Sequence, residues 1–352
     1  PDRFDLARNG CPAANDLTPR HESAGSAETT TDTKVTFTNR TRNEELVNTP
    51  PGEMALSHPD RFIFGEECWA SVSGHRMRYL RAGSGPPLVL IHGIFGYAFS
   101  WRFNWEALAR QFTVYAVDLL GIGFSDRPIA WSVPFDLPAT ADRMLDWMSQ
   151  TGIRDAVLLG TSHGGGLALA MAARDRQKGS GLIRKLVSVA GVNPWTTRGH
   201  KRAAVFGHPI GGAIFKMLAP IVGVPKLSML ERMYGDNSLL TDATRNGYSQ
   251  SVDLPRSIDY GIAICRSWRG DLAYLRAAIE AIGDLPTLLI WGRRDKVVPL
   301  ASGEKLKRHL KNAKLVVMDR AGHLPYEEYP EEFNRILLEF LTANAPTEGT
   351  EA

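Results

Sequence analysis

The chain alternates short apolar runs with longer segments in which apolar residues recur at helical spacing. The apolar runs lie at residues 87–91, 113–117, 157–159, 186–191 and 286–291. They lack the regular polar alternation of a half-exposed strand and are typical of strands buried on both faces. Amphipathic segments at residues 101–111 and 139–151 separate the first of these runs. Buried strands that alternate with helices at this spacing predict a doubly wound, mostly parallel α/β sheet.

This pattern divides the chain into a core, an insertion and two ends. The alternation is present in residues 56–193 and 284–345, which we expect to form the core. Residues 194–283 lack the strand pattern, and amphipathic pieces broken by Gly and Pro predict a helical cap over the sheet. Residues 1–55 are polar, which predicts a loosely held extension or a segment that packs across a neighbouring subunit. Residues 346–352 form a tail.

The same pattern predicts the remaining elements. Further strands are expected at residues 68–73, 75–81 and 314–318. Further helices are expected at residues 213–218, 226–233, 257–268, 271–282, 302–311 and 331–342. The large apolar side chains of the insertion are expected to form its own core: Trp195, Phe206, Phe215, Met217, Met229 and Met233.

Composition and charge narrow the classes of partner. The chain has 352 residues, of which 43% are hydrophobic and 22% charged, as in a globular protein with a large core. A formal net charge of +3 is too small and too dispersed to indicate a nucleic-acid partner. No run approaches the ~18 apolar residues of a membrane span. Nothing near the start resembles a signal peptide, which leaves the compartment open and favours the cytoplasm.

The three cysteines, Cys11, Cys68 and Cys265, lie far apart in the sequence. Their spacing fits neither a metal site nor a disulfide framework, so free or buried thiols are the simplest interpretation. A bridge between Cys68 and Cys265 is the alternative.

Residues 160–164 read Gly-Thr-Ser-His-Gly and stand between an apolar run and a helical segment rich in small residues. A strand, a sharp turn and a helix in that order place Ser162 at the apex of a strained elbow with its hydroxyl exposed. Gly160 and Gly164 leave space where a Cβ would strike the neighbouring chain. The pattern alone is common, and a Gly-rich turn with a solvated serine is the alternative interpretation.

A serine hydroxyl is a poor nucleophile and needs a base that is itself oriented by a carboxylate. Two loops downstream of Ser162 provide these groups. Asp295 follows the apolar run that ends at Trp291, and His323 follows the strand expected at residues 314–318. In an open α/β sheet, loops at the carboxyl ends of strands lie at one edge, so the three side chains are expected to converge.

With these motifs, residues 61–345 resemble the α/β-hydrolase superfamily, whose nucleophile, acid and base follow in the order Ser, Asp, His. The matching segments are residues 92–96 (His-Gly-Ile-Phe-Gly), 118–126, 160–164, 292–295 (Gly-Arg-Arg-Asp) and 322–323 (Gly-His). His92-Gly93 followed by Ser100-Trp101-Arg102 is similar to the epoxide hydrolase and haloalkane dehalogenase branch. That branch has an aspartate at the elbow. Because this chain has Ser162, the resemblance carries over the fold and the cap, but not epoxide opening.

The resemblance implies roles for individual residues. Ser162 attacks an acyl carbonyl, His323 takes its proton, and Asp295 holds the imidazole. Backbone N–H groups of Ile94 and His163 would bind the oxyanion. The implied substrate is a small-molecule ester, and neither a metal nor an organic cofactor is expected.

Other residues near these motifs have supporting or pocket roles. His92 is expected to brace the oxyanion loop by hydrogen bonding, and Asp118 and Asp126 to accept backbone N–H bonds in a Gly-rich turn. The side chains expected to line the substrate pocket are Phe95, Trp195 and Leu324.

These features predict a serine carboxylesterase for small to medium acyl chains. Carbon–carbon bond hydrolases of ring-cleavage products share the triad and the cap and form one alternative, although they usually carry Gly-Pro in the oxyanion loop, which residues 94–96 lack. Lactonase and perhydrolase activities are compatible with the same residues. A receptor-like α/β-hydrolase that binds a small molecule without turnover is the alternative of another class.

Overall fold

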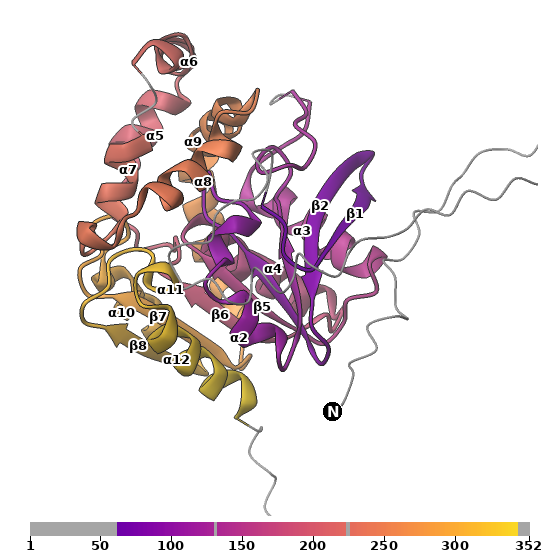
Figure 1. Cartoon of the computed structure of the whole chain (residues 1–352). Helices are drawn as coiled ribbons and strands as arrows, with labels where there is room; N and C mark the ends of the chain where they lie inside the picture. Colours follow the sequence, from indigo (N-terminus) through magenta and orange to yellow (C-terminus); the bar gives the residue numbers. More distant parts are fainter. Residues whose placement is uncertain (1–61, 130–131, 223–225, 344–352) are drawn as a thin grey trace, which may run out of the picture.

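The computed structural model describes residues 62–129, 132–222 and 226–343. At its centre lies an eight-stranded sheet in the order β1-β2-β4-β3-β5-β6-β7-β8 (Figure 1). The strands are β1 (Glu66–Val72), β2 (His75–Ala82), β3 (Pro87–Ile91), β4 (Thr113–Val117), β5 (Ala156–Thr161), β6 (Ile183–Val189), β7 (Thr287–Gly292) and β8 (Ala313–Met318). β2 pairs antiparallel with β1 and β4, and all other neighbours are parallel. The predicted mostly parallel sheet is confirmed.

Helices cover both faces of this sheet. Outside the insertion they are η1 (Ala98–Trp101), α2 (Trp105–Ala109), α3 (Leu137–Gln150), α4 (His163–Lys178), α10 (Leu300–His309), α11 (Pro325–Glu328) and α12 (Pro330–Thr342). Buried residues of α3, α4 and α10 pack on one face. Those of α2, α11 and α12 pack on the other. The central strands are therefore buried on both faces, which explains their continuous apolar sequence.

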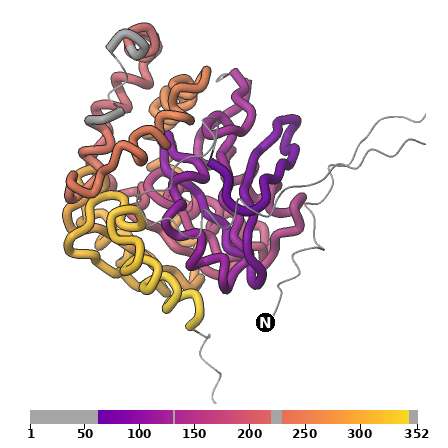
Figure 2. The backbone as a smooth tube through the Cα atoms, viewed as in Figure 1, coloured from indigo at the N-terminus to yellow at the C-terminus, as the bar shows by residue number. Residues whose placement is uncertain are grey.

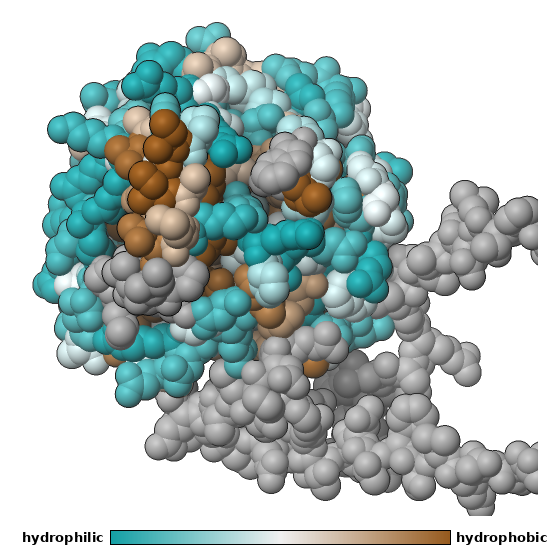
Figure 3. Space-filling model, turned by 90° about the horizontal axis from the view of Figure 1, so that it is seen from above, coloured by the Kyte–Doolittle hydropathy of each residue, from teal (hydrophilic) through white to brown (hydrophobic). Residues whose placement is uncertain are grey.

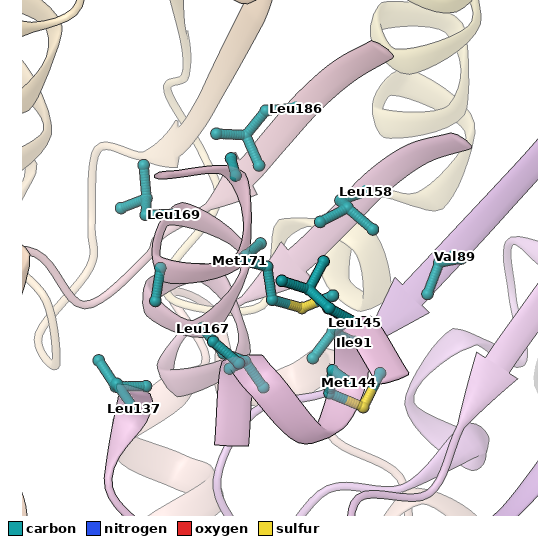
Figure 4. Packing of buried hydrophobic residues seen from close by; sticks show 14 of the residues in the cluster. Val89, Ile91, Leu137, Met144, Leu145, Leu158, Leu167, Leu169, Met171 and Leu186 are labelled. Atoms are coloured by element: carbon teal, nitrogen blue, oxygen red, sulfur yellow. The ribbon is translucent and has the colours of Figure 1, made fainter. Parts of the chain in front are cut away.

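Alternate side chains of each central strand belong to different hydrophobic clusters, as the core between the sheet and α3–α4 shows. Val89 and Ile91 of β3 point into this layer, with Leu158 of β5 and Leu186 of β6 (Figure 4). Their neighbours in sequence on β3, such as Leu90, belong to the opposite cluster, because side chains alternate along a strand. The helices contribute Met144, Leu145, Leu167, Leu169 and Met171.

Between β6 and β7 the chain forms helices that stand to one side of the sheet (Figures 1 and 2). They are α5 (His200–Gly207), α6 (Pro209–Val222), α7 (Lys226–Met233), η2 (Asn237–Leu239), α8 (Asp242–Val252), α9 (Ser257–Ala278) and η3 (Ile279–Ile282). We call α5–α9 the inserted helices. α9 packs against α3, α4 and α5 and joins the insertion to the core.

Several predictions for individual elements were wrong. The helix break expected between residues 268 and 271 does not occur, since α9 runs through Gly270. A helical glycine costs only about 1 kcal/mol relative to Ala, and buried apolar residues such as Ile264 and Leu272 on either side hold the helix. α5 and α8 were not predicted. The helix expected at residues 101–111 is limited to α2 (Trp105–Ala109), preceded by a turn.

α5 and α6 expose several large apolar side chains, which the sequence interpretation did not anticipate. Met217 was expected in the core of the insertion, but 63% of it is exposed. Exposed apolar side chains on these two helices are Val205, Ile210, Ile214, Met217 and Leu218. Seen from the end where these helices lie, the molecule presents an apolar patch between polar surfaces (Figure 3). Among the described residues, no helix is both long and apolar enough to cross a bilayer.

The cysteines differ from the simplest expectation. Cys68 is buried in β1 and disulfide-bonded, so it is not a free thiol. Cys265 of α9 is free, which excludes the alternative bridge between these two residues. Cys11, the expected extension at residues 1–55 and the tail at residues 346–352 lie outside the described residues.

Candidate functional site

Ser162 stands in the sharp turn between β5 and α4, as predicted. Its backbone has φ 54° and ψ −121°, in a region that costs a non-glycine residue on the order of 1–3 kcal/mol. Neighbouring glycines make this geometry feasible. A Cβ on Gly160 would lie 2.1 Å from the Gly164 carbonyl oxygen, and one on Gly164 would lie 2.2 Å from the His92 carbonyl oxygen. Both glycines are therefore required by close backbone approach.

The structure brings together three side chains that are far apart in the sequence. His323 Nε2 lies 2.9 Å from Ser162 Oγ, and His323 Nδ1 lies 2.8 Å from Asp295 Oδ2. The network assigns the Nδ1 proton to the bond with the carboxylate, which leaves the Nε2 lone pair to accept from the serine hydroxyl. The His323 side chain is fully buried, so water does not compete for these bonds.

Asp295 is fixed by the turn that follows β7. Its Oδ1 accepts hydrogen bonds from the backbone N–H of Val297 at 2.7 Å and of Val298 at 2.9 Å. These bonds leave Oδ2 directed at the imidazole. A carboxylate held in this way can orient one histidine tautomer and stabilise its charged form.

The loop that carries His323 is held by Glu328, which the sequence interpretation missed. Glu328 Oε1 accepts from the backbone N–H of Gly322 at 2.8 Å, and Oε2 accepts from that of Gly235 at 2.7 Å. The His323 N–H in turn donates to the Met233 carbonyl oxygen at 2.6 Å. Burial raises the pKa of Glu328 above its usual range. The turn that carries His323 is thus fixed by both α11 and the end of α7.

Glu327 forms a second buried network that the sequence interpretation also missed. Its Oε2 accepts from Arg102 Nη2 at 2.9 Å and from the Tyr234 hydroxyl at 2.8 Å, and Tyr248 donates to its Oε1. Burial raises the pKa of both tyrosines well above 10, so they remain protonated donors. This network ties the segment after η1 to the inserted helices. Two adjacent acids just after the histidine motif were the available signal.

The expected oxyanion loop lies beside Ser162 and is braced as predicted by His92. His92 Nδ1 donates to the Gly93 carbonyl oxygen at 2.7 Å, and Nε2 accepts from the Leu119 N–H at 3.0 Å. Burial lowers the pKa of His92, so the imidazole is neutral and can do both. Phe95, two residues after Gly93, has a positive φ of 62° and is a second strained residue beside Ser162.

Ile94 and His163, the expected oxyanion donors, both lie next to Ser162. Ile94 lines the space around Ser162. His163 is the first residue of α4, so its backbone N–H has no acceptor within the helix. The positive end of the α4 dipole adds to the attraction for an anion at this point.

Asp118 and Asp126 accept backbone N–H bonds, as predicted for this turn. Asp118 accepts from Ala98 N at 2.8 Å and from Phe124 N at 2.9 Å. Asp126 accepts from Arg76 N at 2.8 Å. Both carboxylates serve the loop structure rather than the space around Ser162.

Two hollows meet at Ser162. The first is apolar, and the predicted pocket residues Phe95 and Leu324 line it, together with Met229, Met233 and Tyr248. The second is a cleft of about 520 Å³, and Ile94 and Ser162 line both hollows. The third predicted pocket residue, Trp195, lines neither hollow. It stacks on His309 of α10 at 4.1 Å between ring centroids.

No set of three or more His, Cys, Asp or Glu side chains in the described part of the chain is arranged to hold a metal ion. Beside Ser162, a hydroxyl, an imidazole and a carboxylate are aligned in hydrogen-bonding order, an arrangement that can pass a proton between the hydroxyl and the imidazole.

Comparisons with known proteins agree with this geometry. Residues 86–330 match the family model described as the alpha/beta hydrolase fold. A 2-hydroxymuconate semialdehyde hydrolase from Pseudomonas sp. is 29% identical over 279 residues, which is 76% of this chain and 91% of the relative. The solved structure of a meta-cleavage product hydrolase from Pseudomonas fluorescens has a TM-score of 0.57 and 28% identity, over 78% of this chain and 97% of the other.

An esterase from Exiguobacterium antarcticum shares the fold, with a TM-score of 0.67 at 20% identity, over 80% of this chain and 100% of the other. The family match covers more than half of the chain and includes the elbow, the oxyanion loop, and the loops of Asp295 and His323. The chain belongs to the alpha/beta hydrolase family.

Proposed function

We propose that this protein is a serine hydrolase that cleaves carboxylic esters of small to medium acyl chain length through an acyl-enzyme on Ser162. The observation that supports this most strongly is the continuous hydrogen-bonded chain from Ser162 Oγ through His323 to Asp295. A serine hydroxyl with such a base can attack an ester carbonyl at neutral pH.

In the proposed reaction, Ser162 Oγ bonds to the acyl carbon while its proton moves to His323 Nε2. The backbone N–H groups of Ile94 and His163 bind the tetrahedral oxyanion, and each such donor typically contributes on the order of 3 kcal/mol. The imidazolium, stabilised by Asp295, then protonates the departing alcohol. Water repeats the sequence in the second half-reaction and releases the acid.

The apolar hollow at Ser162 is the proposed site of the acyl chain. Phe95, Met229, Met233 and Leu324 line it, and such side chains favour a hydrocarbon over water by about 25 cal/mol per Å² of buried apolar surface. Two of them, Met229 and Met233, belong to α7, so we propose that the inserted helices act as a cap that completes the substrate site.

Replacement of the nucleophile tests the proposal. Ser162→Ala should lower kcat/KM for p-nitrophenyl butyrate by at least about 10³-fold, and a fluorophosphonate probe should label the parent but not the variant. Ser180→Ala, at an exposed turn after α4, is the matched control and should keep full activity. Activity of Ser162→Ala within tenfold of the parent would contradict the assignment.

Hydrolysis of a carbon–carbon bond is the second candidate, because one relative is named as a 2-hydroxymuconate semialdehyde hydrolase and one similar solved structure as a meta-cleavage product hydrolase. The triad is compatible with both reactions, and residues 94–96 lack the Gly-Pro that those enzymes usually carry. Measuring kcat/KM for a dienoate ketone and for a matched ester separates the two. Slow single labelling of Ser162 without sustained turnover of either would instead favour a binding protein.

A further inference from the structure

The second hollow at Ser162 is lined by basic side chains and by no carboxylate. Beside Ser162 and His163, its walls include five cations: Arg198, Lys201, Arg202, Arg232 and Lys296. They come from three separate parts of the chain: the segment between β6 and the first turn of α5, α7, and the loop after Asp295. The formal net charge of the whole chain is only +3, so the concentration of charge here is local.

These five cations have no carboxylate partner among the described residues. Lys201 and Arg202 lie in the first turn of α5, where the helix dipole disfavours positive charge, and that turn contains no acidic residue. Their mutual repulsion and the dipole would both be relieved by a bound anion.

His163 is an independent indication that the same cleft binds a polar group. Its side chain lines the cleft and is only 4% exposed, yet neither ring nitrogen has a hydrogen-bond partner in the described part of the chain. An unpaired polar group in a buried position is costly. A polar substrate atom in the cleft would supply that partner next to the nucleophile.

The apolar hollow and the basic cleft both open at Ser162, so one ester could place its acyl chain in the first and its alcohol in the second. We propose that the natural substrate is an ester with an apolar acyl chain whose leaving alcohol carries a phosphate group, held by the cations of the cleft. This inference rests on the proposed ester hydrolysis at Ser162. A phosphate carries close to two negative charges at pH 7 and three acceptor oxygens, which suits several cations better than a single carboxylate does.

The chemistry at the reacting bond is that of the proposed hydrolase. The acyl carbon–oxygen bond breaks, His323 protonates the alcohol oxygen, and water releases the acid, while the phosphate ester bond stays intact. Because a cleft lined by one sign of charge concentrates the field, it should accelerate capture of the anionic ester, and salt should weaken this effect.

A matched pair of substrates tests the inference. Butyrate release is compared for 1-butyrylglycerol 3-phosphate and for the neutral ester 1-butyrylglycerol. A third ester, 2-butyryloxyacetate, carries a carboxylate instead of a phosphate on its leaving alcohol. The parent should prefer the phosphate ester over the neutral ester in kcat/KM by about tenfold or more. That ratio should fall as salt is raised from about 0.02 M to about 0.5 M.

A charge-removing variant assigns the preference to the cleft. Lys201→Gln with Arg202→Gln removes two of the five cations and should lower the ratio of phosphate to neutral ester by at least about threefold. Lys305→Gln with Arg308→Gln, on the exposed face of α10, removes the same charge elsewhere and should keep the parental ratio. The ratio is an internal measurement, so a general loss of active protein does not change it.

The outcomes separate this inference from the proposed function. Turnover of the neutral ester with no preference for the phosphate ester would overturn the inference alone. A preference for 2-butyryloxyacetate but not for the phosphate ester would also overturn it. So would a preference for the phosphate ester that is unchanged in the Lys201–Arg202 variant. Failure of the parent to cleave any of the three esters would overturn ester hydrolysis itself.

Discussion

Gly292 is a position where one methyl group should disable the site without touching the triad. It ends β7 directly beneath the turn that carries His323. A Cβ at this position would lie 1.9 Å from the Gly322 carbonyl oxygen and 2.4 Å from that of Ala321. Both contacts are with backbone, so no side-chain rotation can relieve them. Gly292→Ala must therefore push the His323 turn away from β7.

The size of the effect follows from these distances. Real Cβ contacts essentially never fall below 3.0 Å, so the turn must move by more than 1 Å. Ser162 and His323 are 2.9 Å apart, and a shift of that size along their axis breaks the hydrogen bond. A 1 Å misplacement can cost about 10²-fold in rate. We expect kcat/KM to fall by about 10²-fold or more, or about 3 kcal/mol of barrier.

The assay compares kcat/KM for p-nitrophenyl butyrate in Gly292→Ala and in a matched variant, Gly270→Ala. Gly270 lies in the exposed interior of α9, and a Cβ there meets nothing within 4 Å. That variant should keep its activity and gain up to about 1 kcal/mol in unfolding free energy. Circular dichroism and thermal melting establish that both are folded. A folded Gly292→Ala protein with kcat/KM within threefold of the parent would refute the steric reasoning.

Two further predictions concern carboxylates. Asp295→Asn should lower kcat by about 10⁴-fold, because an amide favours the wrong imidazole tautomer. Its melting temperature should change little, since the amide oxygen can still accept the Val297 and Val298 N–H bonds; a large drop in melting temperature would contradict this. Burial raises the pKa of Asp271 to about 6, so its ionisation destabilises the fold as pH rises from about 4 to about 6. Asp271→Asn should therefore be more stable above about pH 6, by up to about 3 kcal/mol, with no gain below about pH 4. Urea unfolding at both pH values measures the difference, and an equal gain at both would show that ionisation is not the cause.

The central strands could be predicted from the sequence because burial on both faces leaves a signal in a few consecutive residues. The predicted strands at residues 87–91 and 113–117 coincide with β3 and β4. The positions of Ser162, Asp295 and His323 in their loops follow from the same signal, since each comes shortly after a strand. That the three meet depends on the parallel order of β5, β7 and β8, which the alternation of strands and helices implies.

The insertion could not be predicted to the same depth because its contacts join residues distant in sequence. Trp195 has the size and apolarity of a pocket residue, yet it packs on His309, more than a hundred positions away. Met217 recurs at helical spacing like a core residue but faces outward. Periodicity shows that a helix has an apolar face. It does not show which neighbour, if any, covers that face.

Hydrogen bonds join the turn that carries His323 to the inserted helices, so a substitution in those helices can also affect His323. The His323 N–H donates to Met233 at the end of α7, and Glu328 bridges Gly322 to Gly235. Met233 at the same time lines the apolar hollow. The segment that lines the apolar hollow is therefore bonded directly to the turn that carries His323. A substitution that moves the end of α7 should alter the rate of proton transfer as well as selectivity, because the two depend on the same backbone.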